Sequence, residues 1–278
     1  MADGESKIED PPSAISHSSS PNPPSDIPHP SSGIKNPVTG RRIKALVPMH
    51  VFGHPVDLEG CRRLCDKFGL ALIEDAAESL GSWYHGRHTG TIGEVGVLSF
   101  NGNKVITTGG GGALLFNDDE LADHAKYLST TAKRPHRWEF FHDEIGYNYR
   151  MPALNAAMGV AQMEKLPRFL EQKRALAERY VEAFADVEGL RFVTEPDGCR
   201  SNYWLNTLVL DEEGPVTRDA LLAATNSNNI MTRPIWAPLH QLPMFQDCPR
   251  MELPVTENLA RRIVNIPSTA GLGLKMED

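Results

Sequence analysis

Two short apolar runs, each ending in polar residues, constrain the fold of this chain most strongly. Residues 70–73 lead into Glu74 and Asp75, and residues 95–98 lead into Ser99. Apolar runs of this length suit buried strands. A single lysine, Lys104, follows among small and polar residues and precedes four consecutive glycines. Because open α/β sheets bind ligands at the carboxyl ends of their strands, we expect a polar site there.

The residue types at this edge suit pyridoxal phosphate (PLP). A lysine amine is a nucleophile only when it is neutral, and no acidic residue between Ser99 and Phe116 favours the charged form of Lys104. Such a lysine can form a Schiff base with an aldehyde, and Asp75 can keep a pyridine nitrogen protonated. The Ser99 hydroxyl can donate to a phosphate, and the glycines permit close backbone approach.

Each of these signals also has an ordinary explanation. A lone lysine in a loop is usually a solvated surface charge, and an aspartate after a strand is often a helix cap. The glycine run lacks the Gly-Lys-Ser/Thr ending of a nucleotide-binding loop. The combination therefore carries the prediction, and no single motif does.

Six segments occur in an order and spacing typical of one family. They are Pro-Met-His-Val-Phe-Gly at 48–53, Ile-Glu-Asp-Ala-Ala-Glu at 73–78, Gly-Thr-Ile-Gly at 90–93, Leu-Ser-Phe at 98–100 followed by Lys104, the glycine run, and Gly-Tyr-Asn-Tyr-Arg-Met at 146–151. From about residue 45 to 271 the chain resembles the DegT/DnrJ/EryC1/StrS family of sugar aminotransferases, which are PLP enzymes of fold type I. Its tail, at 202–205, 232–236 and 265–268, is most similar to the subgroup that aminates keto-sugars on routes to legionaminic and related nonulosonic acids.

The resemblance implies a role for each matching residue. Lys104 would be the Schiff-base lysine and proton shuttle, and Asp75 would pair with the pyridine nitrogen. Glu78 occupies a position, often Gln in the family, near the ring oxygen or the sugar. Ser99 would bind the cofactor phosphate, and Asn148 would reach the cofactor phosphate of a neighbouring subunit. Because related dehydratases replace the lysine by histidine, Lys104 favours transamination.

The resemblance also implies the substrates and the assembly. We expect amino transfer from an amino acid, usually glutamate, to a keto-sugar, usually nucleotide-linked, in surface polysaccharide or amino-sugar biosynthesis, by a homodimer. Arginine suits a bidentate grip on a sugar-nucleotide diphosphate. The candidate substrate residues are His50, Tyr84, Arg150, Arg233 and His240, with His85 and Trp236 as further cleft candidates, although packing is the more ordinary role for Trp236.

The first 44 residues do not resemble the family. Residues 1–40 contain 8 Pro and 9 Ser, a composition that cannot bury enough apolar surface to offset the entropy of ordering. We expect residues 1–44 to be disordered, residues 45–166 to form part of a PLP-binding large domain, and residues 167–278 to form a smaller α+β domain. The expected fold class is α/β, with a mixed, mainly parallel sheet. We expect a chain truncated at its N-terminus, with weak or absent activity.

Overall composition is consistent with an α/β enzyme. The 278 residues carry a net charge of −8, which does not indicate nucleic-acid binding. No apolar run approaches the roughly 20 residues of a membrane helix, and no signal pattern opens the chain, so we expect a cytoplasmic protein with no membrane partner. Four cysteines imply no disulfide framework. Cys61 and Cys65 share a helix face, where we expect core packing and no metal.

Local patterns predict the elements between these motifs. Asp57 should cap a helix through Phe68, with Gly69 ending it. Asn117 should open a capping box for a helix to about Leu128. Strands are expected at 44–49, 70–74, 95–100, 112–116 and 203–210, and helices at 153–166, from Pro167 to 184, and at 218–226, with Pro167 kinking or restarting the long helical run.

Two other classes of protein remain open at this point. The first is a cofactor-free remnant that only binds a sugar nucleotide or a full-length partner. The second is a different lysine enzyme, such as a Schiff-base aldolase, which Asp75 and the glycine run disfavour. Borohydride trapping would separate the aldolase from a PLP enzyme, because only the latter would yield a pyridoxyl adduct on Lys104.

Overall fold

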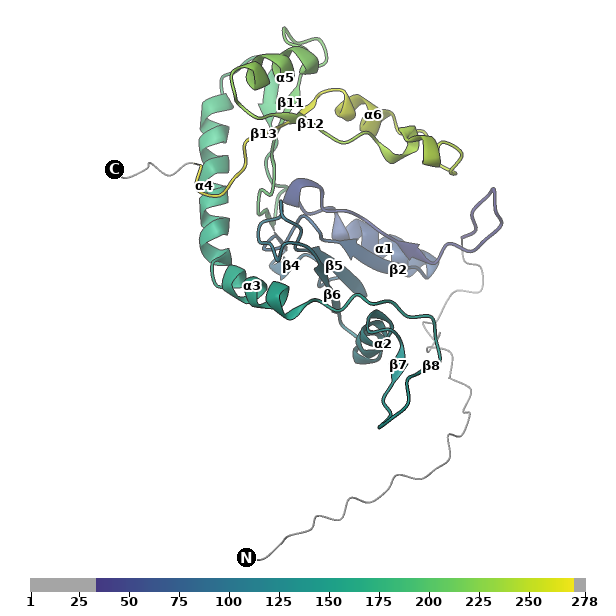
Figure 1. Ribbon diagram of the computed structural model, residues 1–278. Helices are drawn as coiled ribbons and strands as arrows, with labels where there is room; N and C mark the ends of the chain where they lie inside the picture. The colour runs from purple at the N-terminus through teal and green to yellow at the C-terminus, as the bar shows by residue number, and fades with distance from the viewer. Residues whose placement is uncertain (1–33, 273–278) are drawn as a thin grey trace, which may run out of the picture.

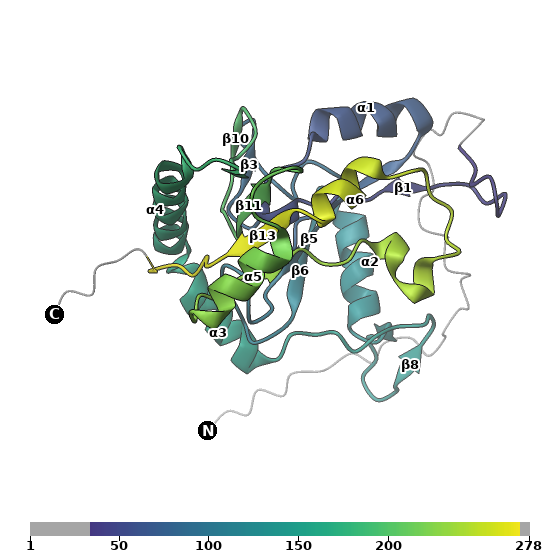
Figure 2. The same ribbon diagram turned by 90° about the horizontal axis from the view of Figure 1, so that it is seen from above.

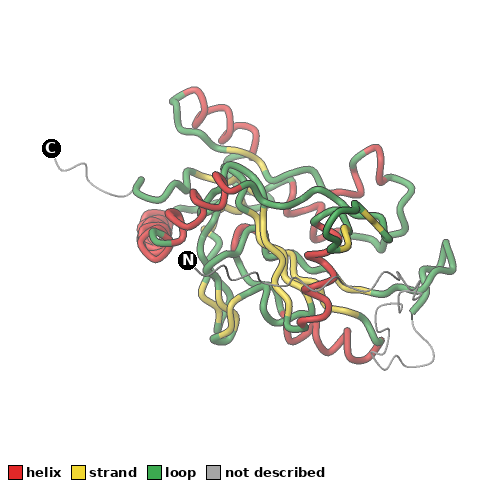
Figure 3. The backbone as a smooth tube through the Cα atoms, turned by 60° about the horizontal axis from the view of Figure 1, so that its bottom comes forward, coloured by secondary structure: helices red, strands yellow, loops and turns green. Residues whose placement is uncertain are grey.

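The computed structural model describes residues 34–272, which form two lobes joined by a long helix (Figure 1). Seen from above, the second lobe lies over the central sheet (Figure 2). Strands gather in the middle of the molecule, and most helices lie outside them (Figure 3). Among the described residues, no helix combines the length and apolar character needed to cross a membrane.

The central sheet of the first lobe has the order β1-β2-β5-β6. Strands β1 (Ala45–Leu46), β2 (Ala71–Asp75) and β5 (Val95–Ser99) run parallel, and β6 (Gly112–Phe116) pairs antiparallel with β5. The expectation of a mixed, mainly parallel sheet is confirmed. In this register Asp75 lies opposite Val97, which places the carboxyl ends of β2 and β5 side by side.

Two helices flank this sheet, and both have side-chain caps. Helix α1 (Leu58–Phe68) begins where the Asp57 carboxylate accepts the N–H of Gly60 at 2.8 Å, and it ends at Gly69, whose φ of 62° suits glycine. Leu58, Cys65 and Leu72 form the core between α1 and the sheet, with Cys61 packed against it.

Helix α2 (Asp119–Ser129) contacts β6. Its cap is Asp118, which accepts the N–H of Leu121 at 2.7 Å. The expected start at Asn117 is therefore wrong by one residue. The Asn117 amide instead donates to the carbonyl oxygen of Gly93 at 2.9 Å, which ties the end of β6 to the loop before β5.

The segment between β2 and β5 contains a further pair of strands. Its strands β3 (Trp83–Tyr84) and β4 (Arg87–His88) form a hairpin. A third strand, β10 (Cys199–Arg200), pairs with β3 from much later in the chain. The two lobes are therefore joined by strand pairing as well as by the connecting helix.

The long helical connection consists of α3 (Ala153–Met163) and α4 (Leu166–Phe184). Pro167 lies in the first turn of α4, where its missing N–H costs no intrahelical bond. The prediction that Pro167 restarts the helix is confirmed. Helix α4 runs from the first lobe to the second (Figure 1).

The second lobe is built on an antiparallel sheet of order β12-β13-β11-β9. Its strands are β9 (Leu190–Phe192), β11 (Asn206–Leu210), β12 (Arg233–Pro234) and β13 (Ile263–Ile266). Leu208, Val264 and Ile266 form its core, against which side chains of α4 and of α5 (Arg218–Ser227) pack. The strand expected from residue 203 begins at Asn206, because the φ of 47° at Tyr203 interrupts extended backbone.

The remaining elements are short. They are η1 (Val51–Gly53), β7 (Lys133–Arg134), β8 (Phe141–His142), η2 (Leu239–Gln241), η3 (Pro243–Phe245) and α6 (Pro254–Ala260). The disorder expected for residues 1–44 falls mostly outside the described residues. The described residues 34–44 include a turn, and Lys35 and Arg42 pair across it in an isolated antiparallel β-bridge. The domain division expected at residue 166 falls at the first turn of α4 and stays a prediction.

Candidate functional site

The site is assembled at the carboxyl ends of β2 and β5. Asp75 ends β2, Ser99 ends β5, and Lys104 lies on the loop between β5 and β6. This loop is held by its own backbone, since the N–H of Lys104 donates to Asn101 at 3.1 Å and that of Thr108 donates to Phe100 at 3.1 Å. The parallel pairing of β2 and β5 thus brings the three expected residues to one edge.

The Lys104 side chain lies between a carboxylate and an aromatic ring. Its Nζ is 3.8 Å from Oε1 of Glu78 and 3.9 Å from the centre of the Trp204 ring, and only 14% of the side chain is exposed. Burial lowers the pKa of the Lys104 ammonium below its ordinary value, and the negative charges of Glu78 and Asp75 offset this only in part. Lys104 therefore yields a neutral amine more readily than a surface lysine.

Glu78 is held in place by an unusual backbone conformation. The N–H of Phe52 donates to Oε2 of Glu78 at 2.8 Å, and Phe52 has a left-handed φ of 59°. Burial raises the pKa of the Glu78 carboxyl above its ordinary value, while the bond from Phe52 and the charge of Lys104 act in the opposite direction. A carboxyl in this environment can share a proton with a neighbouring amine.

Asp75 is half-buried, and its Oδ1 accepts the N–H of Ala77 at 3.1 Å. Ser99 accepts the N–H of Asn101 at 3.3 Å, an orientation that leaves its hydroxyl proton available. Asp75 and Ser99 therefore both lie at the Lys104 edge. The second carboxylate oxygen of Asp75 and the hydroxyl proton of Ser99 remain available for further hydrogen bonds.

Trp204 was not among the site residues predicted from the sequence. Its indole N–H donates to the carbonyl oxygen of Asn103 at 2.7 Å. Trp236 stacks on Trp204 with ring centres 6.1 Å apart and planes at 7°, and Phe52 lies 6.0 Å from Trp236. Trp236 itself is 57% exposed, so this aromatic stack runs from Lys104 to the surface. The only sequence signal for Trp204 was its place in the family-like segment 202–205.

Asn202 joins the two lobes beside this stack. Its amide donates to the carbonyl oxygens of Glu78 and Leu80, each at 2.9 Å, and its Oδ1 accepts the N–H of Trp204 at 2.7 Å. Gly53 makes room for this amide, because a Cβ built on Gly53 would lie 1.9 Å from Oδ1 of Asn202. We call these contacts of Asn202 the Asn202 latch.

The side chain of His50 bonds to Glu74 and Val56 and makes no contact with Lys104 among the described residues. His50 is completely buried, its Nε2 lies 3.1 Å from Oε2 of Glu74, and its Nδ1 accepts the N–H of Val56 at 3.2 Å. Burial alone would raise the pKa of Glu74, but bonds from His50 and from three backbone N–H groups in residues 90–93 hold it below its ordinary value. His50 thus supports the β2–β5 loop, and we propose no substrate contact for it.

Four other expected residues lie at or near the surface of the first lobe. Tyr84 accepts the N–H of Glu59 at 3.3 Å, at the start of α1, and the His85 ring stacks on Tyr84 at 4.5 Å. Asn148 and Arg150 are exposed, and Asn148 forms a β-bridge with Thr130. None of these has a contact with Lys104 in the described structure, which is compatible with the role in a neighbouring subunit that we expect for Asn148.

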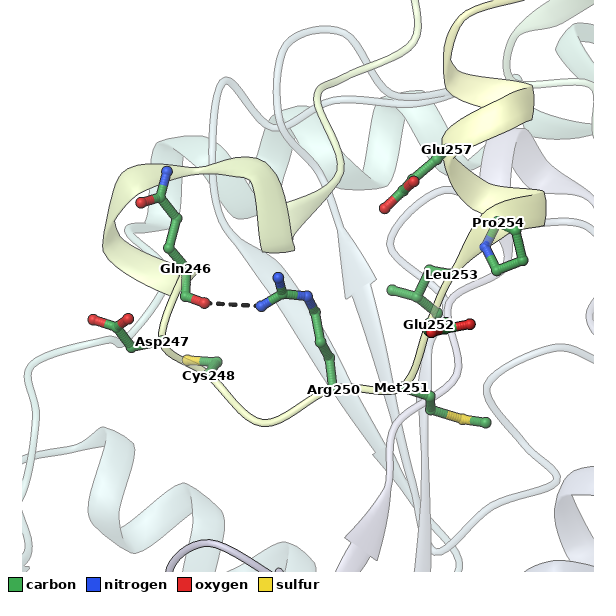
Figure 4. A pocket seen from close by; sticks show the side chains of 9 residues that line it. All are labelled: Gln246, Asp247, Cys248, Arg250, Met251, Glu252, Leu253, Pro254 and Glu257. Atoms are coloured by element: carbon green, nitrogen blue, oxygen red, sulfur yellow. Dashed lines mark hydrogen bonds between the residues drawn. The ribbon is translucent and has the colours of Figure 1, made fainter.

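The two expected residues of the second lobe also make local contacts. Arg233 donates to Asn226 at 3.0 Å, and His240 lies 2.9 Å from Oε1 of Glu257. Glu257 lines a surface pocket in which Arg250 donates to the carbonyl oxygen of Gln246 at 2.8 Å (Figure 4). Lys104, Asp75 and Glu78 do not line this pocket, so we do not assign the reaction to it.

The donor set at the Lys104 edge fits PLP better than it fits a metal. Within residues 34–272, no three His, Cys, Asp or Glu side chains converge on a metal position. A desolvated lysine, a half-buried aspartate and a serine hydroxyl instead provide an amine, a partner for a pyridine nitrogen and a donor to phosphate.

Comparison with known proteins identifies the family of this chain. The chain matches the model of the DegT/DnrJ/EryC1/StrS aminotransferase family over residues 25–277. It is 37% identical over 233 residues to the GDP-perosamine synthase of Vibrio cholerae, which covers 84% of this chain and 63% of that protein. It is 41% identical over 202 residues to the putative pyridoxal phosphate-dependent aminotransferase EpsN of Bacillus subtilis, covering 73% and 51%.

Solved structures of aminotransferases have a similar fold. The aminotransferase TlmJ from Streptoalloteichus hindustanus matches with a TM-score of 0.78 at 34% identity, over 84% of this chain and 63% of that one. The fold is thus that of the fold type I PLP-dependent transferases. The chain belongs to the DegT/DnrJ/EryC1/StrS aminotransferase family. It spans 63% and 51% of the lengths of the two curated relatives.

Proposed function

We propose that this chain carries the active-site lysine of a PLP-dependent aminotransferase that acts on a keto-sugar. The observation that carries the proposal is the position of Lys104, whose ammonium is desolvated between Trp204 and Glu78 beside Asp75. Membership of the family and the GDP-perosamine synthase among its relatives support this reaction class. When bound, PLP supplies an electron sink for the carbon that gains or loses the amino group.

The chain's own residues then have separable roles. Lys104 holds the cofactor through its amine and, once free, moves a proton at Nζ. Asp75 pairs with the pyridine nitrogen, and Ser99 donates to the phosphate. Trp204 covers one side of Nζ, and the burial of Lys104 lowers the pKa of its ammonium. Glu78, 3.8 Å from Nζ, can hold the proton that Nζ gives up.

The substrate that we propose is a nucleotide-linked keto-sugar, with an amino acid such as glutamate as donor. The similarity to GDP-perosamine synthase and, at 32% identity, to a dTDP-sugar aminotransferase of Saccharopolyspora spinosa supports a nucleotide sugar. The exposed indole of Trp236, stacked on the Trp204 ring that contacts Lys104, offers an apolar surface for a sugar ring. The nonulosonic acid subgroup and the glutamate donor stay predictions.

We also propose that the protein is a homodimer. The segment from the β7–β8 turn to α3 exposes large apolar side chains in close succession, a surface that soluble monomers rarely present. They include Trp138, Phe140, Ile145, Tyr149, Leu154 and Val160, each more than half exposed. Asn148 lies within this surface, in line with its expected reach toward a neighbouring subunit. Sedimentation of the wild type beside Ile145→Asp tests the assembly, and we expect the variant to shift toward monomer.

Absorbance with added PLP tests the proposed function. If the proposal holds, the wild type binds PLP stoichiometrically and shows a protein-bound band near the visible edge, which would overturn the weak or absent activity expected from the sequence. Lys104→Ala should lose this band, while Lys126→Ala, on the exposed face of α2, should keep it. Borohydride should then attach a pyridoxyl group to Lys104, as read by peptide mass spectrometry. If the wild type shows no band, the chain is not a PLP enzyme as it stands, and a binding role takes precedence.

A further inference from the structure

A second buried lysine lies behind the aromatic stack. Lys173, on α4, is 5% exposed, and its Nζ donates to the carbonyl oxygens of Trp204 at 3.1 Å and Ser268 at 2.6 Å. Within residues 34–272 it forms no ion pair with a carboxylate. Burial lowers the pKa of Lys173 to about 8, and no nearby charge opposes this.

Such a lysine does not serve stability well. A buried ammonium loses its hydration, and two neutral carbonyl oxygens replace that hydration less well than a carboxylate would. Apolar residues of similar length often match or exceed the stability of a buried charge. The function of Lys173 is therefore better sought in what its two hydrogen bonds hold.

One of these bonds holds the backbone of Trp204, and the other holds the carbonyl oxygen of Ser268. Lys173 fixes the carbonyl oxygen of Trp204, Asn202 accepts its N–H at 2.7 Å, and Asn103 accepts its indole N–H at 2.7 Å. The ring so fixed lies 3.9 Å from Nζ of Lys104. A continuous path of contacts thus connects α4, the helix between the lobes, to the reactive amine.

We propose that Lys173 is a positioning residue of the active site, which holds Trp204 against the ammonium of Lys104. The proposal rests on the proposed function, because it takes Lys104 as the reactive amine. Lys173 itself touches neither Lys104 nor Glu78 among the contacts of the described structure. It acts through Trp204, whose ring both covers Nζ of Lys104 and makes a cation–π contact with it.

The test measures the protonation of Lys104 in the full chain without added PLP. Trace labelling with acetic anhydride across a pH series, followed by peptide mass spectrometry, gives the midpoint at which the Lys104 amine becomes reactive. The matched variants are Lys173→Met, which removes the donor but keeps the length, and Tyr180→Phe. Tyr180 lies on the same helix and donates to the carbonyl oxygen of Pro267 at 3.0 Å, so its variant also removes a bond from α4 without releasing Trp204.

We expect the Lys104 midpoint to move by about half a pH unit or more in Lys173→Met, because a displaced Trp204 ring changes both the desolvation of Nζ and its cation–π contact, and to stay at the wild-type value in Tyr180→Phe. An unchanged midpoint in a folded Lys173→Met protein would overturn the proposal. If this variant does not fold, Lys173→Gln replaces it, and the same two results decide. The measurement is independent of PLP binding, so a missing PLP band would remove the proposed function without affecting this result.

Discussion

The ammonium of Lys104 lies over the Trp204 ring, and the indole N–H of Trp204 donates to Asn103, the residue that precedes Lys104. One side chain of the second lobe thus contacts both the reactive amine and the backbone that carries it. Because Trp204 precedes β11 and Lys104 follows β5, the amine has this environment only when both lobes are in place.

Trp204→Phe tests this double contact. Phenylalanine keeps an aromatic face but cannot donate to Asn103, so we expect a loss of about 1–2 kcal/mol in the free energy of unfolding. Urea denaturation gives this value. Trp236→Phe is the matched control, since Trp236 is largely exposed and its indole N–H makes no hydrogen bond in the described structure. Equal losses in the two variants would contradict the importance of the Asn103 bond.

Glu78→Gln separates charge from shape at the amine. The variant keeps an oxygen for the N–H of Phe52 but removes the negative charge that raises the pKa of Lys104. We expect the Lys104 labelling midpoint to fall by about one pH unit. Glu59→Gln, which removes only an exposed pairing with Arg63 at 4.0 Å, should leave it unchanged. A rise in the midpoint of Glu78→Gln would show that Glu78 does not stabilise the ammonium.

Much of the site could be predicted because its residues follow recognisable strands. Asp75 and Ser99 end apolar runs, and parallel strands place such ends together. Both ends of α1 could also be predicted from the sequence, because Asp57 and Gly69 make their capping contacts with residues three or four positions away in the chain. These predictions depended on contacts that are local or that follow from the direction of two strands.

The contacts that the sequence did not predict join distant segments. Trp204 reaches Lys104 from 100 positions along the chain, and β10 pairs with β3 across a similar distance. His50 was expected near the substrate, yet it bonds to Glu74. The sequence held one indication of the Glu74 environment. Because side chains alternate along a strand, Glu74 must point away from the face used by Asp75.

Gly53→Ala tests the Asn202 latch. Gly53 has a φ of 94°, and a Cβ there would lie 1.9 Å from Oδ1 of Asn202, so the amide must move. We expect a loss of at least about 2 kcal/mol in the free energy of unfolding. Gly86→Ala is the matched control, because Gly86 has a φ of 80° but nothing within 4 Å of an added Cβ. Urea denaturation should therefore show a smaller loss for Gly86→Ala, and equal losses would mean that backbone strain alone sets the effect.

His54 should make the stability of the protein depend on pH. Both ring nitrogens are buried without a partner among the described residues, and the ring meets Tyr203 edge-on at 5.2 Å. Burial lowers the pKa of His54 to about 4, and the charge of Glu195 opposes this only in part. In the unfolded chain a histidine titrates near 6.5.

These two pKa values determine how the free energy of unfolding changes with pH. The unfolded state takes up a proton first as the pH falls, so stability is fully present above about pH 6.5 and is lost progressively toward pH 4. Between pH 7 and pH 5 this group alone should remove about 2 kcal/mol from the free energy of unfolding. His54→Phe, which keeps an aromatic ring beside Tyr203, should lack this loss. Urea denaturation of the wild type and of His54→Phe at pH 7, 6 and 5 measures this loss. If the free energy of unfolding changes equally with pH in the two proteins, His54 does not resist protonation in the folded state.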